Sequence, residues 1–516
     1  MLVVGAGPTG LLLAAELLRR DVPCLLIDAV DAPLGWDRAT VVHARSMEIF
    51  EALGLAHHFL ERGARTRAAR FRSGGEVLGE LNFAEADGRY SFDIGISEEV
   101  TESVLTGYLE AHGGAVTRST RLVGLRPVSG GVVATLERHG EREEVEVSWV
   151  VGCDGLRSTV RKQAGIDFAG AEAEAPWAVF DATLEGWDEG YDMVFPHLDV
   201  PPVILTPLPD RRWRVYLRPT SDTSDLATEA LGVLRRYDPD VAFADIENPA
   251  RFRCHSRVAE RFREGRLLLA GDAAHVCSPA EGHGMNTGLQ DAFNLGWKLA
   301  LVTQGVSGKS LLDSYEVERR PVALRVVSSG KDAEAVQAMT ARAERAARDA
   351  AIRTTFADPD TGHHEAVAAA ELDRSYAGSA IVQGEASGPL DAGARLPLTE
   401  PVQTSAGESS ALHELTHRSG HTLLVLGGPD AMAAEVAELA ASLEADHADS
   451  PLVSAIAGLT TRGGDPRIGR MAEYVAEQLG VRGVTVLAVR PDRYVGLRHD
   501  GADPGAVGRY LEAVSA

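Results

Sequence analysis

Cysteine, long apolar runs and positive charge are all scarce in this sequence. Its four cysteines lie far apart and form no CxxC pair, which argues against a zinc knuckle or a redox disulfide. The 16 histidines include no HExxH motif, so no metal site is expected. No apolar run approaches the ~20 residues that span a bilayer. The first strand begins at once and leaves no space for a signal peptide, so a cytoplasmic protein is expected.

Acidic residues outnumber basic ones by 75 to 51, which gives a formal net charge of -24. This charge repels phosphate backbones and anionic lipid, so neither nucleic acid nor a membrane surface is an expected partner. Hydrophobic residues make up 45% of the sequence and charged residues 24%, as in ordinary globular domains. The length of 516 residues predicts about three domains.

A glycine-rich stretch at the start of the chain predicts a dinucleotide site. The apolar strand 2–4 runs into Gly5, Gly7 and Gly10, which have GxGxxG spacing before an apolar helix. These glycines permit a tight turn, close approach of a pyrophosphate to the backbone, and close packing of helix on strand. A second apolar strand ends at Asp28, where a ribose hydroxyl pair needs an acceptor. The alternative is an ordinary glycine-rich strand-to-helix turn.

A β-meander is expected between the dinucleotide stretch and a second candidate site. Three strands at 122–125, 132–136 and 145–151 are separated by glycine-rich and charged turns. The last strand leads into Asp154 and Gly155, which places an acid at the end of a strand that returns to the nucleotide site. Asp-Gly is also a common turn pair, so this motif indicates a cofactor contact only when it occurs together with the other motifs.

The third stretch joins a buried strand to a glycine-rich loop. The apolar run 267–270 places Asp272 at the carboxyl end of a strand, where ligands bind in parallel sheets. An amphipathic helix is expected from Met285 through Val302, with the partial positive charge of its N-terminus directed at that ligand.

A second sheet is expected from residue 176 to about 262. Apolar strands at 177–182, 203–205 and 213–217 are separated by exposed prolines. We assign this sheet to the substrate.

In this order, the GxGxxG stretch, Cys153-Asp154-Gly155 and Gly271-Asp272 resemble the single-component, group A flavin-dependent aromatic hydroxylases. Para-hydroxybenzoate hydroxylase and phenol hydroxylase typify this group, and the likeness, which covers residues 2 to about 330, extends to its aromatic polyketide hydroxylase branch. The resemblance implies an α/β fold with a Rossmann-like FAD-binding domain, an inserted β-meander and a second mixed-sheet substrate domain. Only one GxGxxG is present, so the nicotinamide is expected to visit and leave.

The C-terminal part resembles the thioredoxin-like tail of the phenol hydroxylase branch, with strands expected at 423–426 and 484–489. It lacks CxxC, which excludes redox exchange and favours a structural or dimerisation role; a homodimer is left open. The expected domains are an FAD-binding domain at 1–175, a substrate-binding sheet at 176–262, the rest of the FAD-binding domain with a helical segment at 263–385, and a thioredoxin-like domain at 386–516.

The resemblance implies a set of FAD contacts. Asp28 would hold the adenosine ribose, Leu122 would make a backbone contact near the adenine, and Asp272 would hold the ribityl chain. Asp154 with Gly155 would support FAD and transient nicotinamide binding. The expected cofactor-binding residues are Gly5, Gly7, Gly10, Asp28, Arg38, Glu98, Leu122, Asp154, Gly155, Asp272, Pro279, Gly282, Gly284, Met285 and Asn286, and the expected catalytic residues are Arg45 and Pro279.

The loop from Pro279 through Asn286 would cradle the isoalloxazine ring, and the helix end behind it would stabilise a flavin that becomes anionic on reduction. Arg45 matches an arginine close to the flavin and substrate, and we expect it to act as an electrostatic helper. The sequence departs from the pattern of the group at Glu98, where a neutral amide commonly touches FAD, and this puts that contact in doubt. Glu281 and His283 replace the usual Gly and Gln beside the flavin.

The expected function is that of an FAD-dependent monooxygenase that uses NADPH or NADH and O2 to hydroxylate a phenolic or polycyclic polyketide substrate through a C4a-hydroperoxyflavin, as in antibiotic biosynthesis. Baeyer-Villiger oxygenation of a polyketide ketone is the alternative on the same fold. A flavin halogenase is disfavoured because no Trp-x-Trp pair is present. A nicotinamide dehydrogenase that uses the first fingerprint alone, and a non-catalytic cofactor-sequestering protein, are the rivals from other classes.

Overall fold

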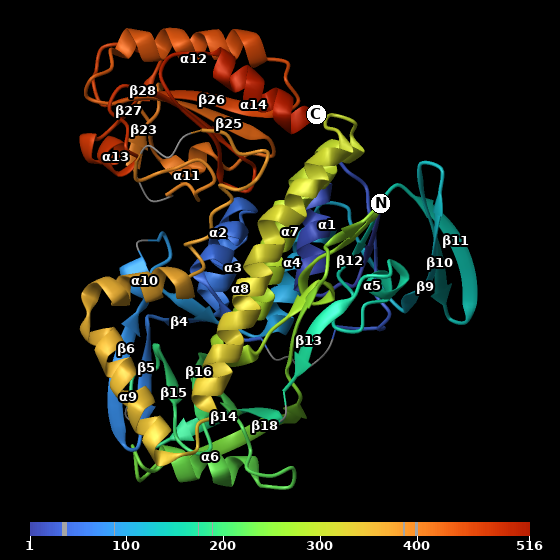
Figure 1. Ribbon diagram of the computed structural model, residues 1–516, viewed down its shortest axis with the longest axis vertical. Coiled ribbons are helices and arrows are strands. Elements are labelled where there is room, and N and C mark those ends of the chain that lie inside the picture. Colours follow the sequence, from blue (N-terminus) through green and yellow to red (C-terminus); the bar gives the residue numbers. More distant parts are fainter. Residues whose placement is uncertain (34–38, 87, 174, 188, 385–387, 398–400) are drawn as a thin grey trace. The chain divides into compact units, whose positions relative to one another are not determined.

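The computed structural model describes residues 1–33, 39–86, 88–173, 175–187, 189–384, 388–397 and 401–516. The chain forms two compact units, and each unit draws on separate stretches of sequence (Figure 1). The first unit comprises Met1–Ala15, Cys24–Ala292 and Val322–Leu372, and the second comprises Glu16–Pro23, Phe293–Pro321 and Asp373–Ala516. Among the described residues, no helix has the length and apolar character needed to cross a membrane.

A six-stranded sheet carries the glycine-rich stretch of the first unit. In spatial order its strands are β20 (Arg263–Glu264), β21 (Leu267–Leu269), β12 (Val150–Gly152), β1 (Leu2–Val4), β2 (Leu25–Ile27) and β8 (Val116–Thr117). Every neighbouring pair except β20 and β21 is parallel. The central strands are buried, which explains why they read as continuous apolar runs in the sequence.

The meander consists of β9 (Thr120–Val128), β10 (Gly131–Arg138) and β11 (Glu141–Val147), paired in antiparallel fashion. The sequence-based prediction of one strand at 145–151 was wrong. The structure ends β11 at Val147 and places β12 in the central sheet, between β1 and β21. The break consists of Ser148 and buried Trp149 between two valines, so the alternating apolar pattern gave no sign of a boundary.

The sheet expected after residue 176 is present as part of a seven-stranded sheet, and its assignment to the substrate stays a prediction. In spatial order its strands are β18 (Ala242–Phe252), β14 (Trp177–Glu185), β17 (Arg212–Leu217), β16 (Val203–Leu208), β15 (Met193–His197), β5 (Ala68–Ser73) and β6 (Glu76–Asn82). Its last two strands come from residues 68–82, outside the range assigned from sequence. Helix α6 (Leu226–Leu234) contributes Ala230 and Val233 to the apolar core on one face.

Two small sheets complete the strands of the first unit. One pairs β13 (Phe168–Glu172), β19 (His255–Ala259) and β22 (His275–Val276), and the other pairs β3 (Val41–Val42), β7 (Asp93–Gly95) and β4 (Ala64–Thr66). In the second sheet Val41 faces Gly95 and Val42 faces Ile94. Continuing this antiparallel register by one step brings His43 opposite Asp93.

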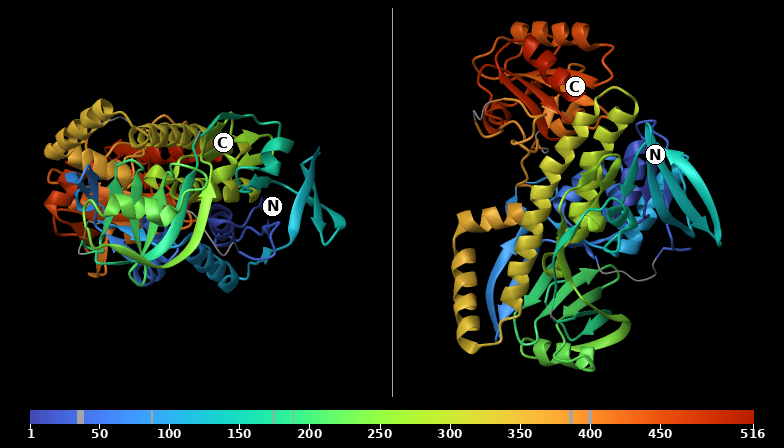
Figure 2. Two further views of the ribbon diagram at one scale, coloured as in Figure 1. Left: turned by 90° about the horizontal axis from the view of Figure 1, so that it is seen from below. Right: turned by 45° about the vertical axis from the view of Figure 1, so that its right-hand side comes forward.

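The remaining helices before residue 370 are short to medium in length, except for two long ones. They are α1 (Pro8–Leu18), α2 (Ala44–Ala52), α3 (Ala56–Arg62), α4 (Glu98–Ala111), α5 (Thr159–Gln163), α7 (His283–Thr303), α8 (Asp313–Gln337), α9 (Arg342–Ala357) and α10 (Pro359–Ala369). Helix α9 lies alongside β6, and α10 crosses the end of that strand, as Figure 1 and the right-hand view of Figure 2 show. Helix α7 begins two residues earlier than the sequence indicates.

The second unit contains its own seven-stranded sheet. The spatial order is β24 (Ser409–Ala411), β23 (Pro401–Gln403), β27 (Gly469–Met471), β26 (Val453–Thr460), β25 (His421–Gly427), β28 (Val484–Val489) and β29 (Val495–Asp500). The helices between and after these strands are α11 (Leu412–Leu415), α12 (Ala433–His447), α13 (Glu473–Gln478) and α14 (Gly505–Ser515). Strands β25 and β26 are parallel, whereas β28 is antiparallel to both β25 and β29.

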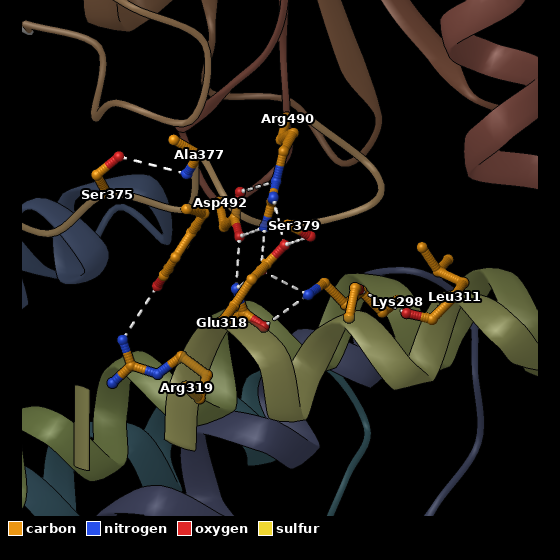
Figure 3. A network of polar contacts seen from close by, with 12 residues as sticks. Lys298, Leu311, Glu318, Arg319, Ser375, Ala377, Ser379, Arg490 and Asp492 are labelled. Carbon is orange, nitrogen blue, oxygen red and sulfur yellow. Dashed lines mark hydrogen bonds and ion pairs between the residues drawn. The ribbon is translucent and has the colours of Figure 1, made fainter. Parts of the chain in front are cut away.

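A buried network of charges lies within the second unit, with Glu318 at its centre (Figure 3). Arg490 donates hydrogen bonds of 2.8 and 2.7 Å to the two carboxylate oxygens of Glu318, and Lys298 donates one of 2.7 Å. Ser379 donates a further hydrogen bond of 2.7 Å, and Arg490 also binds Asp492 at 2.6 Å. The charged side chains are 0 or 1% exposed, so two buried cations are balanced by two buried carboxylates.

Candidate functional site

The carboxyl ends of four parallel strands meet at one edge of the central sheet. Gly5 follows β1, Asp28 follows β2, Asp154 follows β12, and Asp272 lies three residues beyond β21. Because neighbouring parallel strands end at the same edge, all three motifs of the sequence lie together there, at the edge where open α/β sheets bind ligands.

The loops that carry these motifs touch one another. A Cβ atom added to Gly5 would lie 2.3 Å from the backbone oxygen of Cys153, and one added to Gly271 would lie 2.6 Å from Oγ1 of Thr9. Gly5 also has φ +101°, which a side chain rarely adopts. The first loop therefore contacts both other loops through glycine backbone, and each contact needs the absence of a side chain.

The first turn of α1 has the features of an anion site. A Cβ at Gly10 would lie 1.9 Å from the backbone oxygen of Gly5, so helix and strand are in close contact. A Cβ at Gly7 would have Oε1 of Glu102 as its nearest neighbour, at 3.8 Å, which leaves space beside the backbone. No acidic residue lies in the first turn of α1, so the helix dipole is available to an anion such as a pyrophosphate.

Asp28 supports the glycine-rich turn and retains acceptor capacity. Its Oδ2 accepts a hydrogen bond of 2.7 Å from the backbone N–H of Ala6, and its Oδ1 accepts one of 3.0 Å from Val30. Because an ionised carboxylate offers about four lone-pair sites, two remain for donors such as ribose hydroxyls. These residues fit the adenosine and pyrophosphate parts of FAD.

Asp154 is largely engaged in holding α5. Its carboxylate accepts hydrogen bonds of 2.5 Å from Oγ of Ser158, 2.6 Å from the backbone N–H of Thr159 and 3.2 Å from that of Val160. Burial raises the pKa of Asp154, and these hydrogen bonds oppose that rise. Gly155 next to it has φ +72° and no neighbour within 4 Å of an added Cβ, so the turn itself is open.

Asp272 lies in a short 3-10 turn, η2 (Gly271–Ala273), and is exposed. A second acid that the sequence analysis missed holds this turn in place. Asp291, buried on α7, accepts a hydrogen bond of 3.1 Å from the backbone N–H of Gly271 and contacts Nε2 of His275 at 2.6 Å. A lone acid amid the apolar residues of α7 was the signal that could have identified it.

The loop that precedes α7 is fixed by Asn286. Its side-chain amide donates hydrogen bonds of 2.9 Å to the backbone oxygens of both Val41 and Gly282, and its Oδ1 accepts one of 3.0 Å from the backbone N–H of His43. The expected loop residues lie in or just after this turn: Pro279 in η3 (Pro279–Glu281), Gly282 at φ +73°, and Gly284 and Met285 half-buried at the start of α7.

The expected helper Arg45 is buried, with its side chain 2% exposed, and its Nη1 contacts Glu48 at 2.8 Å. The acid three residues along α2 thus offsets the positive charge, which an i,i+3 pattern could have indicated. Glu98 begins α4, and Leu122 is buried on β9. Arg38 lies outside the described residues. The roles assigned to these residues stay predictions.

Two imidazoles and two carboxylates form a cluster beside the same loop. Nδ1 of His43 lies 3.0 Å from Oδ2 of Asp93, and Nδ1 of His283 lies 3.2 Å from Oε1 of Glu371. The centroids of the two imidazole rings are 5.0 Å apart. Sequence analysis noted His283 as unusual but missed the other three, because His43 and Asp93 are 50 residues apart and meet only through the pairing of β3 with β7, and Glu371 comes from a still more distant segment.

Comparison with known proteins agrees with this arrangement. A family model described as an FAD binding domain matches residues 1–329. Pentachlorophenol 4-monooxygenase of Sphingobium chlorophenolicum is 35% identical over 337 residues, which are 63% of this chain and 63% of that protein. The 12-dehydrotetracycline 5-monooxygenase/anhydrotetracycline 6-monooxygenase of Streptomyces rimosus subsp. rimosus is 32% identical over 523 residues, 96% of this chain and 94% of that protein.

The solved structure of aklavinone-11 hydroxylase with FAD and aklavinone has a TM-score of 0.78 at 25% identity, and the alignment covers 100% of this chain and 98% of that one. The fold is thus the mixed α/β fold of FAD-binding monooxygenases. The chain spans less than two thirds of the length of the pentachlorophenol enzyme, 63%, but nearly all of the tetracycline enzyme. The resemblance drawn from the three motifs is therefore confirmed, and the chain belongs to the flavin-dependent aromatic monooxygenases that share this FAD-binding domain.

Proposed function

We propose that the protein binds FAD at the edge of the central sheet and uses NADPH or NADH and O2 to hydroxylate an aromatic substrate. The observation that carries this proposal is the contact of the three motif-bearing loops, through Gly5 with Cys153 and through Thr9 with Gly271. These loops lie side by side although more than 100 residues separate each from the next. FAD, when bound, supplies the hydride acceptance and oxygen activation that protein side chains lack.

The residues of the chain divide the work of holding FAD. The first turn of α1 would bind the pyrophosphate, Asp28 the ribose, and the loop fixed by Asn286 the isoalloxazine ring. Asp272, exposed beside the Thr9 contact, would accept hydrogen bonds from the ribityl chain. The protein must also exclude water from the ring, because a wet site would release reduced oxygen as hydrogen peroxide.

The seven-stranded sheet of the first unit would cover the side of the isoalloxazine ring on which the substrate binds. Tyr216 on β17 is 8% exposed, and its hydroxyl lies 3.0 Å from Oγ1 of Thr40, which immediately precedes β3. This contact joins the sheet to the segment that leads to His43 and the Asn286 loop. Arg214 on the same strand is neutralised by Asp181 at 2.7 Å, so it would not hold a substrate anion.

The substrate we propose is a phenol or a polycyclic aromatic polyketide. The names of the relatives support this class, since they act on pentachlorophenol and on anhydrotetracycline, and one neighbouring structure holds aklavinone. Both classes carry phenolic hydroxyl groups, which donate electron density to the ring that an electrophilic oxygen attacks. The experiment described below determines which of these two classes of substrate the protein prefers.

We infer further that the C-terminal part of the second unit is a thioredoxin-like domain. Support comes from the order β26-β25-β28-β29, in which a parallel β-α-β unit is followed by an antiparallel strand pair and a final helix, α14. The four cysteines of the chain all precede residue 278, so the domain has no thiol for redox exchange. A structural role, including a dimer contact, fits this composition.

The test is to purify the protein, measure bound flavin by its visible absorption, and follow NADPH and NADH oxidation with and without phenols and anthraquinone-like polyketides. We expect a yellow protein whose NAD(P)H oxidation is stimulated several-fold by at least one such compound, with one oxygen atom from labelled O2 in the product. Product NMR separates ring hydroxylation from ester formation by Baeyer-Villiger oxygenation. A protein that takes up no FAD, or that reduces FAD with no dependence on any aromatic compound, would contradict the proposal.

A further inference from the structure

The cluster of His43, Asp93, His283 and Glu371 has no assigned role in the proposed reaction. It lies within the first unit and is nearly closed to solvent: the side chains of His43 and Asp93 are 5 and 7% exposed, and those of His283 and Glu371 are 10 and 0% exposed. Burial of two carboxylates and two imidazoles is costly unless charges and hydrogen bonds compensate one another. A buried cluster of titratable groups beside a ligand site indicates that one of its members interacts electrostatically with the ligand.

His43 carries a positive charge at neutral pH. Burial lowers its pKa, but the charge and hydrogen bond of Asp93 on β7, with further help from Glu371 and the backbone of Glu281, raise the pKa of His43 to about 9. Among the described residues, His283 on α7 is a further titratable group beside it, and the Glu281 carboxylate of the adjoining turn accepts a hydrogen bond of 2.8 Å from Ser329.

The Nε2 edge of the His43 ring faces the loop before α7. Nδ1 is held by Asp93, whereas Nε2 is buried on the side of the Glu281 backbone. A Cβ added to Gly282 would lie 3.5 Å from this Nε2. Gly282 is the last residue before α7, so the nitrogen is aimed at the turn from which the partial positive end of the helix emerges.

We propose that the His43 imidazolium, held by Asp93 and aimed at the Gly282 turn, is a fixed positive charge that favours the reduced, anionic form of a bound FAD. This inference rests on the proposed function, because the Pro279–Asn286 loop is where the isoalloxazine ring would lie. The helix N-terminus alone offers about half a positive charge. Asp93 contacts the Nδ1 edge of His43, so the positive charge that the imidazolium adds at the loop lies on its opposite, Nε2 edge, in a site that water screens little.

The sign of the effect follows from electrostatics. Reduction adds negative charge to the ring, so a nearby cation stabilises the reduced form and raises the midpoint potential. Removing the cation lowers the potential. Because His43 loses its charge as pH rises through about 9, the wild-type protein should lose the same stabilisation at high pH.

The experiment is spectroelectrochemical titration of bound FAD in substrate-free, FAD-loaded protein between pH 6 and pH 10. At pH 7 we expect His43→Gln to lower the midpoint potential by at least the equivalent of a tenfold change in the reduction equilibrium, ~30 mV for a two-electron couple. The difference in potential between the variant and the wild type should shrink as pH rises from 9 to 10. Equal potentials throughout this range would overturn the inference while leaving the monooxygenase proposal intact, whereas failure of the wild type to take up FAD would overturn both.

Two further variants separate charge from structure. Asp93→Asn keeps the imidazole but removes the main group that raises its pKa, so convergence with His43→Gln should move to lower pH. This variant also carries the test if His43→Gln fails to fold. His57→Gln, on the exposed surface of α3, is the matched control and should follow the wild-type curve at every pH. An Asp93→Asn curve that coincides with the wild type would also overturn the inference.

Discussion

Gly10→Ala is expected to weaken FAD binding at least tenfold, a loss of ~1.4 kcal/mol or more. The added Cβ would lie 1.9 Å from the backbone oxygen of Gly5 and 3.1 Å from its carbonyl carbon. Neither atom can move unless β1 and α1 separate, and that movement displaces the N–H groups that would bind the pyrophosphate. Titration of the apoprotein with FAD, followed by flavin fluorescence, measures the loss.

The matched control for this variant is Gly107→Ala. Gly107 lies on α4, and an added Cβ there would meet nothing within 4 Å. Alanine is the better helix former by up to ~1 kcal/mol, so this variant should bind FAD like the wild type and be equally or more stable. If Gly10→Ala bound FAD with unchanged affinity, the pyrophosphate would have to bind elsewhere than at the first turn of α1.

The second large effect is expected at Glu318, where Glu318→Gln should lower the free energy of unfolding by ~3–5 kcal/mol. The substitution leaves Arg490 and Lys298 in the buried network with only Asp492 to balance them. Burial raises the pKa of Glu318, but Arg490 and Lys298 outweigh it and hold the pKa well below the usual range, so the carboxylate is charged at every pH of interest. Urea denaturation followed by tryptophan fluorescence measures the loss, because Trp297 lies 5.3 Å from the Arg490 guanidinium.

The pH dependence of this loss identifies its cause. Burial lowers the pKa of Lys298 to about 8, although Glu318 opposes that shift. Without Glu318 the pKa falls further, so the folded variant binds fewer protons than the folded wild type below pH 8. The difference in the free energy of unfolding between the wild type and Glu318→Gln should therefore decrease as pH rises toward 8 and stay constant above pH 8. A difference that is the same at pH 6 and pH 8 would contradict this account.

Two variants serve as controls for Glu318→Gln. Glu444→Gln, on the exposed face of α12, should change stability by no more than ~0.5 kcal/mol. Adding Lys298→Met to Glu318→Gln removes the stranded cation and should recover part of the loss, as a double-mutant cycle would quantify. Additive losses from the two substitutions would mean that the pair does not interact as the structure indicates.

Local sequence patterns predicted the parts of the site that form locally. The GxGxxG spacing placed β1, α1 and Gly10 correctly, because that turn is built within a few residues and tolerates few alternatives. The position of Asp28, Asp154 and Asp272 at one edge followed from the rule that parallel strands end together. The roles of these residues in binding FAD are still predictions.

Contacts between segments that are distant in the sequence could not be predicted from local sequence patterns. Nothing in residues 41–43 or 93–95 indicates that β3 and β7 pair, so His43 and Asp93 could not be joined. The boundary between β11 and β12 was missed because hydrophobicity does not record which sheet a strand enters. The neutralisation of Arg45 by Glu48 is a different case, since an i,i+3 pair on a predicted helix is readable from sequence.

The order of strands in the central sheet also sets when the cofactor pocket can exist during synthesis. Strand β1 is made among the first residues, but its neighbour β12 ends at Gly152 and the next strand, β21, ends only at Leu269. At a ribosomal speed of about 5–20 residues per second, the synthesis of β21 follows that of the GxGxxG stretch by on the order of 10 to 50 s. Until then β12 lacks its parallel partner β21, and the loop that carries Asp272 has not been made. The nascent chain should therefore be unable to retain flavin, and ribosome-arrested chains that stop short of residue 269 should emerge colourless.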